Sequence, residues 1–176
     1  MWKNITVRYG TVAGIVLSFL LFLPYALWGS RYYFDLAEGV AYAAILLSLA
    51  TGIALGIRHR RERECEGVIP FTKAFSTGWT IALVASVVVY LSVYLFLELK
   101  GDEWRERYYQ HRLEQLHEKY PDAQTFELKV TELNSEITSG SRDLQNVNSQ
   151  AAMIFFIVLL FGTVISLAAG AIQRKE

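Results

Sequence analysis

The sequence predicts an all-α polytopic membrane four-helix bundle with an extracytoplasmic helical hairpin between the third and fourth spans. One observation is that the apolar residues gather in four blocks that are almost free of charge. Each block has about 20 residues or more, the length that a helix needs to cross a hydrocarbon core of ~30 Å. Another is that the polar stretch before the last block has a helical repeat of apolar residues. We therefore expect one membrane domain over residues 1–176, with spans at about 9–28, 36–57, 71–97 and 149–172 and the extracytoplasmic segment at about 100–148.

The first span, at about 9–28, follows Lys3 and Arg8. The apolar run is too long for the core of a secretory signal, and no small-residue cleavage site follows it. We therefore expect a retained membrane helix. Pro24 lies near its outer end, where a freed carbonyl reaches the wet interface.

The second span starts where Asp35 and Glu38 precede an apolar run, at the spacing of helix-capping residues. A carboxylate at Glu38 would suit an ion pathway, but it lies one turn inside the helix start, where a negative charge complements the helix dipole. Capping is the interpretation that we prefer. The span continues to about Ile57.

A basic hinge separates the second and third spans. Its cationic residues form the expected topology signal, because short loops rich in Lys and Arg stay in the cytoplasm. They are Arg58, Arg60, Arg61, Arg63 and Lys73. The hinge and both termini are therefore expected in the cytoplasm. An alternative role for the arginines is to bind anionic lipid head groups or a partner.

The third span, at about 71–97, leads into the extracytoplasmic segment. Pro121 and Asp122 divide this segment into two amphipathic helices, which predicts an antiparallel hairpin. A further break is expected at 139–141, where the sequence reads Ser-Gly-Ser. The two apolar stripes are a candidate interface for a second copy or for another membrane protein. They comprise Tyr109, Leu113, Leu116 and Tyr120, and Phe126, Val130, Leu133 and Ile137.

Small residues recur at steps of four along every span. In lipid such stripes let helix backbones approach closely and gain dispersion contacts. The stripes are Gly10, Gly14 and Ser18; Ala44, Ser48, Gly52 and Gly56; Gly78, Ala82 and Ser86; and Gly162, Ser166 and Gly170. We expect them to pack the four helices together. The alternative is a homodimer formed through Gly52 and Gly56.

Composition excludes several classes of function. A formal net charge of zero gives no basis for nucleic-acid binding. Cys65 is the only cysteine, so neither an intramolecular disulfide nor a thiol metal site is expected. His111, Glu114 and Glu118 share a helix face, but they alternate with basic residues, which is typical of a solvated charged face. The sequence has no phosphate-binding glycine loop and no zinc-protease motif. We expect no cofactor, no metal and no enzyme activity.

At residues 67–78 the sequence reads Gly-Val-Ile-Pro-Phe-Thr-Lys-Ala-Phe-Ser-Thr-Gly. This stretch, with four spans, a long polar segment and a basic tail, resembles a bacterial membrane family called domain of unknown function 4199, which is found mainly in Bacteroidota. The resemblance covers essentially the whole chain, and Pro70 departs from the small polar residue expected there. It implies residence in the bacterial inner membrane, and it implies no established activity and no functional residue.

Two functions compete. The first is a non-enzymatic accessory or assembly subunit that presents the hairpin to a partner or to its own copy. The second is a small-solute transporter or channel subunit, in which Ser48, Thr51, Ser86 and Ser166 would line a polar cavity. The midsections of the four spans lack ionisable residues, which coupled transport usually requires. We therefore prefer the first function, with the lipid bilayer and a membrane partner as the expected contacts.

Overall fold

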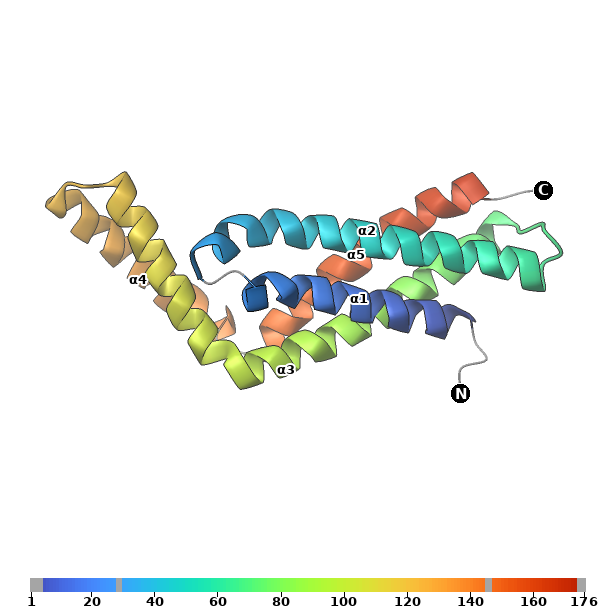
Figure 1. Cartoon of the computed structure of the whole chain (residues 1–176), viewed down its shortest axis with the longest axis horizontal. Helices are drawn as coiled ribbons and strands as arrows, with labels where there is room; N and C mark the ends of the chain where they lie inside the picture. The colour runs from blue at the N-terminus through green and yellow to red at the C-terminus, as the bar shows by residue number, and fades with distance from the viewer. Residues whose placement is uncertain (1–4, 28–29, 145–146, 174–176) are drawn as a thin grey trace.

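The computed structural model describes residues 5–27, 30–144 and 147–173. The side chains at 24–27, 30–38, 40–42, 44 and 136–144 lie outside the description, which includes Pro24, Asp35 and Glu38. Over the described ranges the structure has five helices and no strand (Figure 1). The helices are α1 (Ile5–Leu27), α2 (Ser30–Glu64), α3 (Phe71–Lys119), α4 (Ala123–Leu144) and α5 (Val147–Gln173). The all-α fold is thus confirmed.

Three of the described helical segments are long and apolar enough to cross a membrane: Ile5–Leu23 of α1, the helix α3, and the helix α5. This supports the expectation of a membrane protein. The second expected span, at about 36–57, lies in α2, where several side chains are outside the description. That span stays a prediction.

The basic hinge is more helical than expected. Arg58 to Glu64 form the last two turns of α2, and the true connection to α3 covers only 65–70. Just beyond the end of α2, Glu66 has a φ of 51°, in the left-handed region, and Gly67 has a φ of 90°. The Gly67 N–H donates to the Arg61 carbonyl at 2.9 Å. This bond spans six positions, one more than the longest bond of a Schellman cap, and it satisfies a carbonyl that the helix end would otherwise leave unpaired.

α3 continues without interruption for 49 residues. The predicted third span, at about 71–97, and the first helix of the predicted hairpin therefore belong to one continuous helix. The one weak helix former at the junction is Gly101, whose cost of about 1 kcal/mol is too small to break a helix. Ion pairs within the helix, such as Lys100 with Glu103 at 2.9 Å, support the backbone there. Figure 1 shows α3 changing direction where its colour passes from green to yellow-green.

α4 begins after the predicted turn at Pro121 and Asp122. The Asp122 carboxylate accepts hydrogen bonds from the Thr125 N–H at 3.0 Å and from the Thr125 hydroxyl at 2.9 Å, so it caps the helix. These bonds hold the pKa of Asp122 below its ordinary value. α4 then continues to Leu144, so the break expected at 139–141 was wrong. Serine and glycine lower helix propensity without forbidding a helix.

α3 is the central helix of the fold. It contacts α1, α2 and α5, and α2 also contacts α1 and α5. The side chains between these helices are fully buried, and the largest include Leu17, Leu49, Ile53, Ile81 and Val158. Figure 1 shows the start of α1, the connection between α2 and α3, and the end of α5 at one end of the molecule. The second half of α3 and α4 lie side by side at the other end.

Candidate functional site

Two of the five cationic residues that were expected to set the topology make hydrogen bonds with other side chains of the chain. Arg60 donates to the Thr77 hydroxyl on α3 at 2.8 Å and pairs with Glu64 at 3.0 Å, which ties the end of α2 to the start of α3. Arg58 pairs with Glu62 at 2.8 Å on the exposed face of α2. That hydrogen bond holds the pKa of Glu62 below its ordinary value.

The other three cations of the hinge point to solvent to different extents. Arg63 and Lys73 are exposed, and Arg61 is half-buried. The five residues therefore have unlike surroundings, and sequence reasoning did not separate them. No local sequence pattern predicts the hydrogen bond between Arg60 and Thr77, because it joins side chains that are 17 positions apart across the turn.

The small residues of α1 lie against α3. A methyl group added at Gly10 would lie 2.6 Å from the Val84 Cβ, and one added at Gly14 would lie 2.7 Å from the Val88 Cβ. Both distances are far below the contact distance of two carbon atoms. Only glycine therefore allows this approach of the two helices. Ser18, the third member of the stripe, is also buried.

The small residues of α2 lie against α1 and α3. A methyl group at Gly52 would lie 2.9 Å from the Ala13 Cβ, and one at Gly56 would overlap the Ile81 side chain. Both glycines suggested for a homodimer thus pack on helices of their own chain. The side chain of Ala44 lies outside the description.

The crossing of α3 and α5 uses small residues from both helices. A methyl group at Gly78 would lie 2.8 Å from the Ser166 hydroxyl, and one at Gly162 would overlap the Ala82 methyl group. Gly170 packs on the first turn of α3. The stripes from the two helices therefore face each other across this contact.

The buried hydroxyl groups are occupied by backbone carbonyls. Ser18, Ser86 and Ser166 donate to the carbonyl four residues earlier in their own helices, at 2.8, 2.8 and 2.6 Å. Ser48 instead donates across the contact with α1, to the Ala13 carbonyl at 3.0 Å. Ser86 and Ser166, which would line a polar cavity in the alternative function, are thus buried and bonded within the bundle, whereas Ser48 and Thr51 line a mostly apolar groove between α1 and α2.

The two apolar stripes of the expected hairpin lie between α3 and α4. Leu133 is 6 % exposed, and His117 of α3 lies edge-on to the Phe126 ring, with 5.3 Å between the centroids. The Tyr109 hydroxyl donates to the Asn134 side chain at 3.0 Å. The remaining described members, Leu113, Leu116, Tyr120 and Val130, are half-buried, and the side chain of Ile137 lies outside the description. Most of the stripe surface is thus used within the chain.

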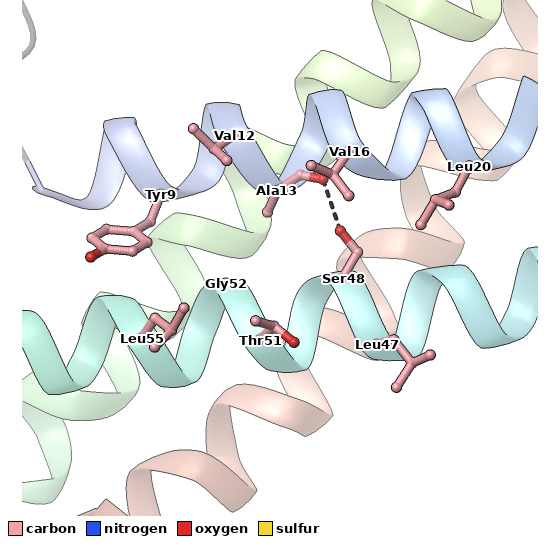
Figure 2. Close-up of a pocket in the computed structure, with 10 residues that line it drawn as sticks. All are labelled: Tyr9, Val12, Ala13, Val16, Leu20, Leu47, Ser48, Thr51, Gly52 and Leu55. Carbon is pink, nitrogen blue, oxygen red and sulfur yellow. Dashed lines mark hydrogen bonds between the residues drawn. The ribbon is translucent and has the colours of Figure 1, made fainter.

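A groove between α1 and α2, which the sequence analysis did not anticipate, is a concave site in the described part of the chain (Figure 2). Its volume is about 330 Å³. Its lining is mostly apolar and consists of Tyr9, Val12, Ala13, Val16, Leu20, Leu47, Ser48, Thr51, Gly52 and Leu55. Figure 2 shows the hydrogen bond from Ser48 of α2 to Ala13 of α1, which joins the two helices that line the groove. Over the described residues, no three His, Cys, Asp or Glu side chains are placed to hold a metal ion.

Comparison with known proteins gives one match. A family model described as a protein of unknown function (DUF4199) matches residues 8–175. Searches of curated proteins and of solved structures found no match.

Proposed function

The chain belongs to the DUF4199 family of proteins of unknown function, and from this premise we propose that it is a four-span, non-enzymatic protein of the bacterial inner membrane. In this proposal α1, residues 36–57 of α2, the first half of α3, and α5 cross the bilayer. The packing of α2 against α1, α3 and α5 supports its inclusion among the spans. The midsections of the proposed spans have no ionisable residue in the sequence. They therefore give no indication of an ion path or of a catalytic group.

The length of α3 is the observation that carries the proposal. Its 49 residues extend for ~73 Å along the helix, whereas a hydrocarbon core is ~30 Å thick. About half of the helix must therefore project, and α4 packs on this projecting half. We propose that the two helices are an extracytoplasmic hairpin that binds another membrane protein or a second copy of the chain.

The exposed side chains of the hairpin define where a partner would bind. Leu128 of α4 is 67 % exposed and Tyr108 of α3 is 37 % exposed, whereas Leu133 of the stripes is only 6 % exposed. Tyr108 also stacks on Trp104, with 5.6 Å between the ring centroids. Aromatic side chains with an exposed face are typical of binding surfaces.

The alternative role in solute transport is not favoured by any described contact. It needs a polar cavity between helices, yet the hydroxyls of Ser48, Ser86 and Ser166 are bonded to backbone carbonyls. We therefore retain the interaction role.

Photo-crosslinking in intact cells tests the proposal. A photoreactive phenylalanine analogue in place of Leu128 should give one protein adduct of fixed mass. The same analogue in place of Phe156, which is equally exposed on the membrane helix α5, is the matched control and should give no such adduct. An adduct of twice the chain mass would identify a second copy as the partner. The absence of any protein adduct at both Leu128 and Tyr108 would reject the interaction role.

A further inference from the structure

The groove between α1 and α2 opens away from the buried core. Its lip is formed by Val12, Val16, Leu47 and Leu55, which are 52 %, 45 %, 69 % and 47 % exposed. An exposed apolar groove of this kind is unfavourable in water and suits the hydrocarbon of a membrane. The part of its wall that α1 provides extends from Tyr9 to Leu20. At 1.5 Å per residue this is ~16 Å, about the thickness of one leaflet.

One end of the groove carries positive charge. Arg8 lies one turn before Val12 on the exposed side of α1, and Arg58 lies one turn after Leu55 on α2. Each arginine therefore lies at the end of one of the two helical segments that line the groove. The two arginines are also the first charged residues beyond the apolar stretches that form these walls. Between the helices at this end, the Tyr9 and His59 rings lie with their centroids 5.8 Å apart.

The charge at this end is not fully neutralised within the chain. The Arg58 Nε donates to Glu62, and the side chain is exposed, so its Nη groups remain available as donors. Arg8 is also exposed. The groove is apolar, is about as long as one leaflet is thick, and has two arginines at one end. It therefore matches a phospholipid that has an apolar acyl chain and an anionic head group.

We propose that this groove binds one acyl chain of an anionic glycerophospholipid, with the lipid phosphate held between Arg8 and Arg58. The inference rests on the proposed membrane residence of the chain, and it is independent of the role of the hairpin. Guanidinium groups recognise phosphate through paired N–H donors, which distinguishes such a site from ordinary solvation by bulk lipid.

Native mass spectrometry of the full chain tests the site. The protein is extracted into mild detergent with equal amounts of phosphatidylglycerol and phosphatidylcholine that carry identical acyl chains. We expect one phosphatidylglycerol to be retained per chain in preference to phosphatidylcholine. Arg8→Gln and Arg58→Gln should each lower this preference about fivefold. Glu62→Gln removes a carboxylate that competes for Arg58 and should raise the retention of phosphatidylglycerol.

Two controls make the result specific. Lys73→Gln removes one exposed positive charge outside the groove and should leave the lipid preference unchanged. Val16→Trp fills the groove from its lip and should reduce the retention of both lipids, while circular dichroism reports whether the helices remain intact. If Val16→Trp does not fold, the two arginine variants still decide the question.

Several outcomes would overturn the proposal. These are equal retention of the two lipids, an equal loss of preference in Lys73→Gln, and a dimer that excludes lipid from the groove. Membrane fractionation separates this failure from failure of the proposed function. A chain found in the soluble fraction would reject membrane residence and the lipid site together, whereas a membrane-bound chain without lipid preference would reject the lipid site alone.

Discussion

The Ser48 hydroxyl on α2 donates a hydrogen bond to the Ala13 carbonyl on α1, at 3.0 Å and across 35 positions of the chain. Ser48 differs in this from the other described buried serines, which bond to their own helices. Hydrogen bonds between membrane helices contribute about 0.6 kcal/mol on average. We expect Ser48→Ala to lower the free energy of unfolding by about this amount. Ser86→Ala is the control and should have a smaller effect, because its hydroxyl only bonds a carbonyl of α3. Equal effects in titrations with a denaturing detergent would contradict this.

Gly162 and Gly39 are a matched pair for testing close helix packing. A methyl group at Gly162 would overlap Ala82, whereas one at Gly39 meets nothing within 4 Å. We expect Gly162→Ala to lower the free energy of unfolding by about 1–3 kcal/mol through overpacking. Gly39→Ala should raise it by up to about 1 kcal/mol, because alanine favours the helix. Opposite signs in the same unfolding assay are the expected result, and a loss of stability in both variants would contradict it.

Glu66 occupies the left-handed region at the end of α2, with a φ of 51°. This conformation costs a residue with a side chain about 1 kcal/mol, and glycine avoids the cost. We expect Glu66→Gly to raise the thermal midpoint. Gly67→Ala should lower the midpoint, because the φ of Gly67 is 90°. The prediction fails if Glu66→Gly is neutral while Gly67→Ala is destabilising.

Asp122 makes the start of α4 sensitive to pH. Hydrogen bonds from Thr125 lower the pKa of the Asp122 carboxyl in the folded chain. The stabilisation is therefore present above the unfolded pKa, about 4, and is lost as the pH falls through the folded value. Amide exchange, corrected for the intrinsic pH dependence of the rates, should show less protection at the start of α4 once the pH falls below the lowered pKa of Asp122. Asp122→Ala should show the reduced protection already at neutral pH. Unchanged exchange in that variant would exclude the cap.

Sidedness is tested with the single native cysteine. If the arginines hold the end of α2 in the cytoplasm, an impermeant maleimide should label Cys65 only after spheroplasts are lysed. In a Cys65→Ser background, a cysteine in place of the exposed Leu128 should react without lysis. The reverse pattern would place the hairpin in the cytoplasm.

The sequence was sufficient for the features that depend on local chemistry. Four apolar blocks predicted helices, and α5, observed at Val147–Gln173, begins and ends within two residues of its predicted span. The turn before α4 was predicted from Pro121 and Asp122, whereas the cap that Asp122 provides is known from the structure. The recurrence of glycine marked positions that now lie at helix contacts, although which helix each would meet was not evident.

The sequence did not predict features that depend on a balance between opposing local energies or on contacts between distant parts of the chain. At Gly101 the helix continues because the local cost is small against the continuous hydrogen bonding of α3. The groove depends on how α1 and α2 are rotated about their axes, and the contact of Arg60 with Thr77 depends on the path of the turn between their helices. The spacing of apolar residues along one helix does not determine how that helix is rotated against its neighbour or which path a turn follows.

The unbroken α3 connects two packed regions of the molecule. Its backbone hydrogen bonds continue from the segment that packs on α1 and α5 to the segment that packs on α4. The part beyond residue 97 is ~33 Å long at 1.5 Å per residue. As a lever of this length, it turns a 10° change in the tilt of the inner segment into a displacement of ~6 Å at its tip. In the proposed membrane arrangement, small adjustments of helix tilt to bilayer thickness would therefore give larger displacements at the end of the hairpin.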